Sequence, residues 1–439
     1  MPASLDIGHG LGPGHPMRQR LADEMHARPT SPVAAPARVL HVARHGAVDP
    51  AADLGYVIGL CERLGLEPPR AGARQFRFTV EGVAIKWERY TESCGWTIVV
   101  PGSPKAPIPA EVRDFIAGAP GQNLAIVDME VHRGTTGAEA AALGLFDPGT
   151  LVASSLGEGR AEIWSDFRIG PEGEVKLILG VREDLVPRTI GNLVQRFLDI
   201  ETYRMLALLA LPVAQRVNQR TTGLDRRLAE LTAAFTAAKD SPEEEAPDDK
   251  ALLAELGAIA AEVEKLVAES TWRFGAARAY HALVEDRIAE NRETPIGGFE
   301  TVGYFMHRRL TPAMRTCESA AARQESLSQR VARSSQILRA RVEIALQAQN
   351  QSLLRSMEKR AGLQLRLQET VEGLSVVVIS YYVVGLIAYV LKGAEKMAPE
   401  LHLSTLAVAG VVPLVLGIVY VGQQRMRRRL HREHSGDEH

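Results

Sequence analysis

The stretch TVEGLSVVVISYYVVGLIAYVLKG, from Thr370 to Gly393, follows a long, charged, helix-forming portion of the chain. It carries no charged side chain between Leu374 and Leu391. A helix that crosses a bilayer needs about 20 mainly apolar residues. The sequence therefore predicts a transmembrane helix over residues 371–391.

A second uncharged run, LSTLAVAGVVPLVLGIVYVG, covers residues 403–422. Pro413 lies inside it, and membrane helices tolerate proline more readily than soluble helices do. Residues 392–402, between the two runs, are predicted to form a short outer loop. Together these segments predict a C-terminal two-helix transmembrane hairpin, and the alternative is a buried pair of helices in a soluble core.

Basic residues flank the predicted hairpin on both outer sides. They precede the first helix at Arg355, Lys359, Arg360 and Arg366, and they follow the second at Arg425, Arg427, Arg428, Arg429 and Arg432. The predicted loop offsets its lysines with glutamates. Because Lys and Arg are retained on the cytoplasmic side, both termini are predicted to be cytoplasmic. In the basic cytosolic tail, residues 423–439, we expect lipid-headgroup contacts at Arg425, Arg427, Arg428 and Arg429.

The composition of the whole chain limits its class. At 439 residues it is too long for one ordinary core. A net charge of -2 gives no indication of a nucleic-acid binder. Three cysteines without a CxxC pair indicate reduced thiols rather than a disulfide framework. The N-terminal stretch lacks the apolar run of a secretory signal, so the portion in front of the hairpin is expected to stay in the cytoplasm.

Residues 38–184 are predicted to form an α+β unit, a cytosolic α/β domain with a mixed sheet. Seven strand-like runs, rich in Val, Ile and aromatic residues, are RVLHVAR, QFRFTV, VAIKWERY, WTIVV, LAIVDMEVH, AEIWSDFRI and EVKLILGV. Helical patterns occur at AADLGYVIGLCERLGL, IPAEVRDFIAG and TGAEAAALGL. Residues 1–37, rich in Gly, Pro and His, are predicted to be a loosely ordered N-terminal segment.

Residues 185–370 are predicted to form long coiled helices, with a linker at 240–249. Pro212 is expected to kink or break the first helix. The second helix carries one apolar stripe with steps of four and three, at Leu252, Leu256, Ile259, Val263 and Leu266. A last helix is expected to start near Pro312 and to continue into the first transmembrane helix. Such helices need partners, so we expect a homo-oligomer.

Catalytic signatures are absent from the sequence. The chain lacks GxxxxGK[ST], HExxH and GxSxG, so it is not expected to be an enzyme and no cofactor is predicted. A divalent cation stays open as a ligand. The segment DIETYR, Asp199–Arg204, is interpreted as an ion-pair cluster between packed helices.

A polar stripe extends from the last long helix into the first predicted span. Gln364, Gln368, Ser375 and Tyr382 recur by four and seven residues, close to one helical face. In a symmetric oligomer this face is a candidate pore lining, because amide and hydroxyl groups can replace water around an ion. The alternative is hydrogen bonding between helices, which is favoured because the two uncharged runs, residues 374–391 and 403–422, contain no carboxylate.

Several long segments carry a family resemblance, namely EMHARP, KWERYTE, SDFRI, LVQRFLDIETYRMLALLALPVA, LTPAMRTC and QNQSLLRSMEKRAGLQLRLQETVEGLSVVVISYYVVGL. Over nearly its whole length the chain resembles a bacterial family of predicted membrane-anchored proteins of unknown function. The family typically has His in place of Tyr90 and Phe in place of Ser93. The resemblance implies the bacterial inner (cytoplasmic) membrane as the location.

The layout also resembles the CorA magnesium channel superfamily, whose members are homopentameric cation channels. The shared layout is a cytosolic α/β domain, helices that fold back, one very long helix entering the first span, a short outer loop, a second span and a basic tail. The superfamily's Gly-Met-Asn motif after a Tyr is absent, because Tyr389 is followed by VLKGAEK. The likeness implies an oligomeric cation channel without implying magnesium selectivity. The alternative is a membrane-anchored scaffold or sensor whose cytosolic domain binds a protein partner.

Overall fold

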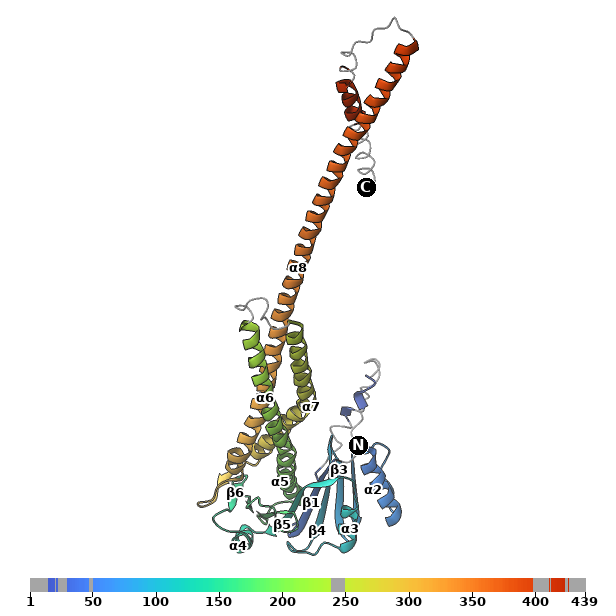
Figure 1. Ribbon diagram of the computed structural model, residues 1–439. Coiled ribbons are helices and arrows are strands. Elements are labelled where there is room, and N and C mark those ends of the chain that lie inside the picture. Colours follow the sequence, from blue (N-terminus) through green and yellow to red (C-terminus); the bar gives the residue numbers. More distant parts are fainter. Residues whose placement is uncertain are drawn as a thin grey trace, which may run out of the picture. The chain divides into compact units, whose positions relative to one another are not determined.

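The computed structural model describes residues 15–19, 21–22, 30–46, 50–237, 249–397, 410, 412–422 and 425 (Figure 1). Two compact units are present, Met1–Gln336 and Ile337–His439, and each is described by itself. The segment EMHARP, most of the predicted linker and most of the predicted basic tail lie outside the described residues.

The first unit is built on one mixed sheet. Its strands are β1 (Ala37–His45), β2 (Gln75–Val80), β3 (Val83–Arg89), β4 (Ser93–Pro101), β5 (Gln122–Arg133), β6 (Val152–Leu156), β7 (Ala161–Ser165), β8 (Val175–Val181) and β9 (Thr294–Pro295). In the described part of the chain they form a 9-stranded sheet in the order β2-β3-β4-β1-β5-β8-β7-β6-β9. The β5/β8 pair is parallel, and the other pairs are antiparallel. The predicted mixed sheet is therefore confirmed.

Two strands were not predicted from the sequence. β6 has the sequence VASSL, whose serines interrupt the apolar pattern although Ser154 is fully buried. β9 is two residues long and contains Pro295, a residue that strands accept only at an edge or an end. β9 pairs only with Ser154 and Ser155 of β6. Tertiary pairing, and not local propensity, therefore makes these strands, and the predicted seven-strand sheet was too small.

One face of the sheet carries three short helices, α2 (Pro50–Leu64), α3 (Ala110–Ala117) and α4 (Thr135–Leu145). Trp87 of β3 and Trp96 of β4 are fully buried in the same cluster as Leu60 of α2 and Val112 of α3. α4 packs on Trp164 and Ile178 further along the same face. Residues alternate between the two faces of a strand, so the neighbours of these tryptophans point to the opposite side.

The opposite face carries α5 (Pro187–Leu208), followed by α6 (Ala210–Ala237) (Figure 1). Phe197 and Leu198 of α5 are buried against Met129 of β5. The predicted break near Pro212 falls at Leu209, which places this proline in the first turn of α6, where a missing amide hydrogen costs little.

Gly191 in α5 lets another part of the backbone cross the helix closely. A β-carbon at this position would clash with the Ser31 carbonyl oxygen. Val33 donates its amide to the Pro187 carbonyl at 2.9 Å, which holds the crossing segment in place. This contact fixes the segment that leads into β1, including Thr30, against α5.

The first unit also contains α7 (Asp249–Glu290) and the first part of α8 (Val302–Met397). The predicted stripe of α7 is largely confirmed, since Leu256, Ile259, Val263 and Leu266 are buried. α6 and α7 are joined by Arg227, whose guanidinium bonds Glu255 and Glu262 at 2.7 Å each.

α8 begins earlier than the predicted start near Pro312. Its first amides have tertiary partners, because Val302 donates to Ser154 Oγ at 2.8 Å and Gly303 donates to Glu293 Oε2 at 2.8 Å. These caps satisfy amides that a helix start leaves unpaired. Pro312 therefore lies inside the helix.

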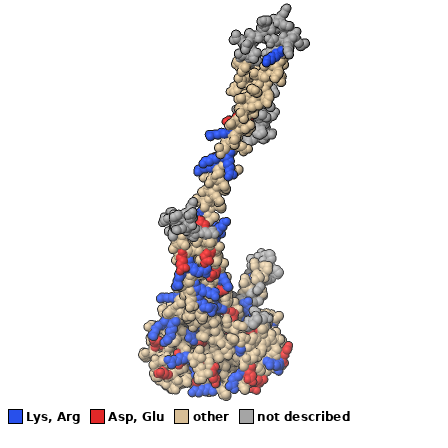
Figure 2. Space-filling model, in the orientation of Figure 1, with Lys and Arg blue, Asp and Glu red and all other residues tan. Residues whose placement is uncertain are grey.

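The second unit contains the rest of α8, including the uncharged run, which Figure 2 shows as a tan stretch of the helix. Among the described residues, one helix is long and apolar enough to cross a membrane, with the apolar window inside Val302–Val390. α8 extends to Met397, so the first residues of the predicted outer loop are helical, as expected for a segment rich in Ala, Glu, Lys and Met. Val412–Gly422 is a shorter apolar helix. The described residues thus contain one helix that is long and apolar enough to cross a membrane, and the predicted two-helix hairpin stays a prediction.

Candidate functional site

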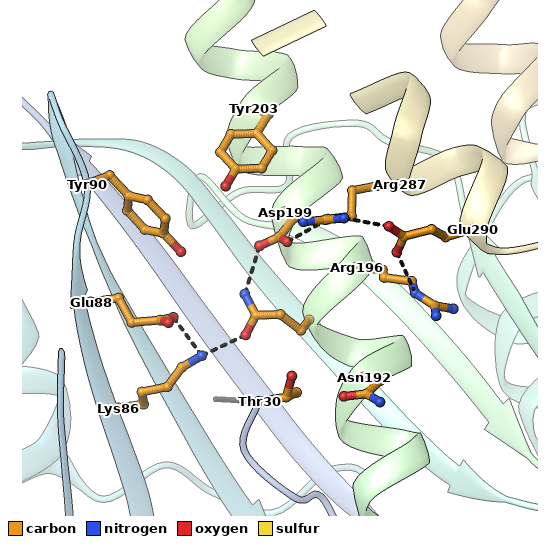
Figure 3. A pocket seen from close by; sticks show the side chains of 11 residues that line it. Thr30, Lys86, Glu88, Tyr90, Asn192, Arg196, Asp199, Tyr203, Arg287 and Glu290 are labelled. Atoms are coloured by element: carbon orange, nitrogen blue, oxygen red, sulfur yellow. Dashed lines mark hydrogen bonds and ion pairs between the residues drawn. The ribbon is translucent and has the colours of Figure 1, made fainter. Parts of the chain in front are cut away.

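A polar cavity of about 380 Å³ lies in the first unit between β3, α5 and α7 (Figure 3). The residues that line it are mostly charged, amide or hydroxyl-bearing, and they are Thr30, Lys86, Glu88, Tyr90, Asn192, Gln195, Arg196, Asp199, Tyr203, Arg287 and Glu290. A concave site with convergent polar groups is the usual setting of a binding site.

The strand β3 supplies one wall through its alternation. Ile85 and Trp87 point into the apolar core shared with α2, whereas Lys86, Glu88 and Tyr90 point toward α5 (Figure 3). The side chains of Lys86 and Glu88 are each only 4% exposed. The sequence KWERY thus places two buried charges at the edge of the cavity.

Helix α5 supplies the opposite wall. Asn192, Gln195, Asp199 and Tyr203 recur at steps of three or four, and Arg196 follows Asn192 by four, so the five residues lie on one side of the helix. The close crossing at Gly191 brings Thr30 to the same wall, and all of these residues except the glycine line the cavity.

A continuous network crosses the cavity from the sheet to α7 (Figure 3). Lys86 Nζ lies 2.6 Å from Glu88 Oε2 and donates to Gln195 Oε1 at 2.6 Å. Gln195 Nε2 donates to Asp199 Oδ1 at 2.7 Å. Arg287 Nε donates to Asp199 Oδ2 at 3.0 Å. Because each amide atom of Gln195 has a fixed partner, the network sets which side of this amide accepts and which donates.

Burial dominates the electrostatics of Asp199. It raises the pKa of this carboxyl, while Gln195 and Arg287 act in the opposite direction. Burial by itself lowers the pKa of the Arg287 guanidinium. The neighbouring carboxylates of Asp199 and Glu290 have a larger combined effect, so the pKa is raised overall. The pair is therefore a partly desolvated ion pair inside the cavity wall.

A second set of ion pairs lies in the wall of the cavity. Arg287 Nη1 donates to Glu290 Oε1 at 2.7 Å, and Arg196 Nε lies 3.1 Å from Glu290 Oε2. Among the described residues, three basic and three acidic side chains line the cavity, so the formal charges of these six residues cancel. This balance suits a ligand that is neutral or zwitterionic better than one with a large net charge.

Two tyrosines contribute aromatic surface to the cavity wall. The rings of Tyr90 and Tyr203 meet edge to face at 6.4 Å between centroids, and Tyr203 stacks on Tyr280 at 5.8 Å. Behind them Arg273 holds Glu92 with two bonds, at 2.8 and 3.1 Å. Tyrosines combine a flat apolar surface with a polar tip, so this part of the wall can contact an apolar or ring-shaped part of a ligand.

His41 lies under the sheet side of this region but takes no part in the cavity. It is buried, with Nδ1 2.9 Å from Thr97 Oγ1 and Nε2 3.2 Å from Thr202 Oγ1. Burial, together with the charge of Lys86, lowers the pKa of His41 to about 3. The ring is therefore neutral at physiological pH and serves as a structural hydrogen-bonding group.

The residues predicted from the sequence lie elsewhere. Gln364, Gln368, Ser375 and Tyr382 are exposed positions of α8 in the second unit. The Gln368 amide donates to Glu372 at 3.4 Å, and the Ser375 hydroxyl donates to the Val371 carbonyl at 2.8 Å, so both bonds stay within the helix. In the part of the chain that the structure describes, no group of three or more His, Cys, Asp or Glu residues could hold a metal ion.

The remaining sequence predictions have mixed outcomes. The ion-pair interpretation of DIETYR is confirmed, because Asp199 pairs with Arg287 of α7 and Glu201 pairs with Arg204. Arg425 is exposed, while Arg427, Arg428 and Arg429 lie outside the described residues. Sequence reasoning missed the cavity itself. The available signal was Lys86 and Glu88, two charges at alternate positions of the strand β3, with Ile85 and Trp87 on the other face.

A family model described as a protein of unknown function (DUF3422) matches residues 13–430. The chain belongs to the DUF3422 family. Every residue that lines the cavity falls inside the matched segment. No curated protein and no solved structure matches this DUF3422 chain.

Proposed function

We propose that this DUF3422 protein is a membrane-anchored sensor whose first unit binds a small polar ligand in the cavity between β3, α5 and α7. The observation that carries the proposal is the charge-balanced network from Lys86 to Glu290, arranged around an open cavity. The ligand class it favours is neutral or zwitterionic, rich in hydrogen-bonding groups and small enough for about 380 Å³.

The network is hard to explain by stability alone. Desolvation of two charges offsets most of their attraction, and buried ion pairs can often be replaced by apolar residues without loss. Lys86 and Glu88 nevertheless lie almost fully buried at the cavity wall. A wall of fixed donors and acceptors is useful when a ligand completes it, because the groups do not reorganise on binding.

Binding is favoured over catalysis by the state of the acidic groups. A general base needs an accessible carboxylate or imidazole within reach of the substrate. Glu88, Asp199 and Glu290 are each held in ion pairs. His41 is buried away from the cavity with both ring nitrogens at threonine hydroxyls.

The membrane anchor rests on the exposed apolar surface of α8. Val377, Ile379 and Leu386 are 61%, 51% and 70% exposed, and they lie in the uncharged run. Such a surface is unfavourable in water and favourable in lipid. We propose an inner-membrane hairpin with cytoplasmic termini, with residues 403–422 as the second span and Arg425, Arg427, Arg428 and Arg429 at the lipid headgroups.

A second candidate function is an oligomeric cation channel of the CorA type. It is favoured by Gln364, Gln368, Ser375 and Tyr382, which lie along one exposed stripe of the continuous helix α8. In a ring of identical chains this stripe would line an axial path for a cation. Light scattering of the detergent-purified protein with and without millimolar magnesium tests it, since a monomer or dimer has no axis to conduct through.

A ligand screen tests the sensor proposal. Purified full-length protein in detergent is heated with a panel of amino acids, betaines and polyols, and a ligand at about 100 times its Kd is expected to stabilise the folded state by about 2.7 kcal/mol. The stabilisation should be lost in Gln195→Leu and retained in Gln364→Ala, which lies outside the cavity. A stabilising compound that acts equally on Gln195→Leu would place its binding elsewhere and contradict the proposal.

A further inference from the structure

A second cavity adjoins the first one. It has a volume of about 260 Å³ and shares Asn192, Arg196 and Glu290 with the first cavity. The Arg196–Glu290 ion pair therefore stands between the two spaces. The first turns of α5 form one wall of the second cavity through Thr189.

The second cavity differs from the first in its charge. Arg160, Arg196 and Arg292 line it, and among the described residues Glu290 is its one acidic lining residue. Glu290 is already bonded by Arg196 and by Arg287 from the first cavity. Arg160 and Arg292 are both exposed, so their guanidinium groups can meet an incoming anion without leaving a buried ion pair. The cavity is therefore electropositive.

A separate observation indicates a missing ligand. Asn291 lines this cavity and is 1% exposed, yet neither Oδ1 nor Nδ2 of its side chain has a hydrogen-bond partner among the described residues. The backbone of Asn291 is held on both sides, by Ile288 at 3.1 Å and by Gly157 at 3.1 Å. A buried amide without partners is unfavourable, so a polar ligand group is expected to complete it.

We propose that the second cavity binds the phosphoryl group of a small soluble phosphorylated metabolite. A phosphate monoester carries about two negative charges and three acceptor oxygens, which match the excess of arginines. Guanidinium groups bind such oxyanions in pairs of hydrogen bonds, and the Asn291 amide adds a further donor. The inference rests on the proposed function, because the neutral or zwitterionic remainder of the same ligand lies in the first cavity.

The test uses full-length protein in detergent free of phospholipid, with inorganic phosphate as the probe in isothermal titration calorimetry at constant ionic strength. Phosphate is expected to bind once per chain, and the Kd should rise about tenfold or more in Arg160→Gln and in Arg292→Gln. Arg182→Gln is the matched comparison, since Arg182 is exposed, pairs with the exposed Asp184 at 3.2 Å and is not among the described residues that line either cavity. Equal weakening by Arg182→Gln, or no saturable binding, overturns the proposal.

Two further arms identify the source of the phosphoryl group and separate the two proposals. Competition by glycerol 3-phosphate assigns a soluble ligand, whereas competition by phosphatidic acid vesicles alone would overturn that assignment. Gln364→Ala, at a residue that lines neither cavity, should leave phosphate binding unchanged. If neutral or zwitterionic ligands bind with the expected loss in Gln195→Leu while phosphate does not bind, the anion site fails and the sensor proposal survives.

Discussion

Replacement of Lys86 by methionine offers a direct test of the cavity network. The change removes the cation that lies 2.6 Å from Glu88 and leaves this carboxylate, 4% exposed, without its nearest partner. It also removes the donor to Gln195 Oε1. Breaking one side of a buried ion pair typically costs about 3–5 kcal/mol.

The double variant Lys86→Met/Glu88→Leu distinguishes the cost of leaving one charge unpaired from the net contribution of the ion pair to stability. With both charges gone, no carboxylate is stranded, and most of the lost stability should return, because apolar replacement of a buried pair is often neutral or stabilising. Glu88→Leu alone strands Lys86 and should be destabilised by a similar amount. The comparison is a double-mutant cycle in which the coupling between two touching residues is measured.

Thermal unfolding of the full-length protein in detergent, followed by tryptophan fluorescence, provides the assay, since Trp87 lies between the two substituted positions. For Lys86→Met the midpoint should fall by about 6–10 °C, at roughly 2 °C per kcal/mol for a chain of this size. Arg182→Met, at an exposed pair, should change stability by less than about 1 kcal/mol. The buried-pair reasoning would be refuted if Lys86→Met lowered the stability by less than about 1 kcal/mol. It would also be refuted if the double variant were no more stable than the less stable of the two single variants.

Three further predictions concern other parts of the molecule. Gly191→Ala should destabilise the first unit and weaken ligand binding, because its β-carbon would clash with the Ser31 carbonyl oxygen. Gly223→Ala in α6 is the control, since a β-carbon there would meet no atom within 4 Å, and thermal unfolding should show it to be neutral or slightly stabilising. His41 has a pKa of about 3 in the folded protein and about 6.5 in the unfolded chain. Its contribution to the stability of the folded state is therefore complete above about pH 6.5 and is lost as the pH falls toward 3. When the pH falls from 7 to 5, the free energy of unfolding of the wild type should therefore decrease by roughly 2 kcal/mol more than that of His41→Gln. Unfolding midpoints measured at both pH values check this, and equal decreases in the two proteins would contradict the burial of a neutral ring. Leu386→Arg places a charge in the uncharged run of α8, which costs about 3 kcal/mol in a bilayer. The amount of this variant that remains in carbonate-washed membranes should therefore decrease. Leu346→Arg, which lies before the uncharged run, is the control and should stay membrane-bound.

Local sequence patterns were sufficient for most of the secondary structure. QFRFTV became β2 over the predicted residues, because alternating apolar and aromatic side chains fit a half-buried strand. The stripe from Leu256 to Leu266 predicted the buried face of α7, because a period near 3.6 decides which residues a helix can bury. The uncharged run that begins at Leu374 is apolar through its composition alone, and no tertiary contact is needed to recognise it.

The cavity and several element boundaries were decided only by tertiary structure. β9 exists because it pairs with β6, and α8 starts at Val302 because Ser154 and Glu293 cap its first amides. The cavity joins Lys86, Asp199 and Arg287, which are distant in sequence and meet only when α5 and α7 pack against the sheet. No local pattern encodes such a meeting, because it depends on which helix face crosses which strand. The sequence by itself therefore determined the helices, most of the strands and the apolar run, whereas the packing of the helices on the sheet decided where polar groups converge.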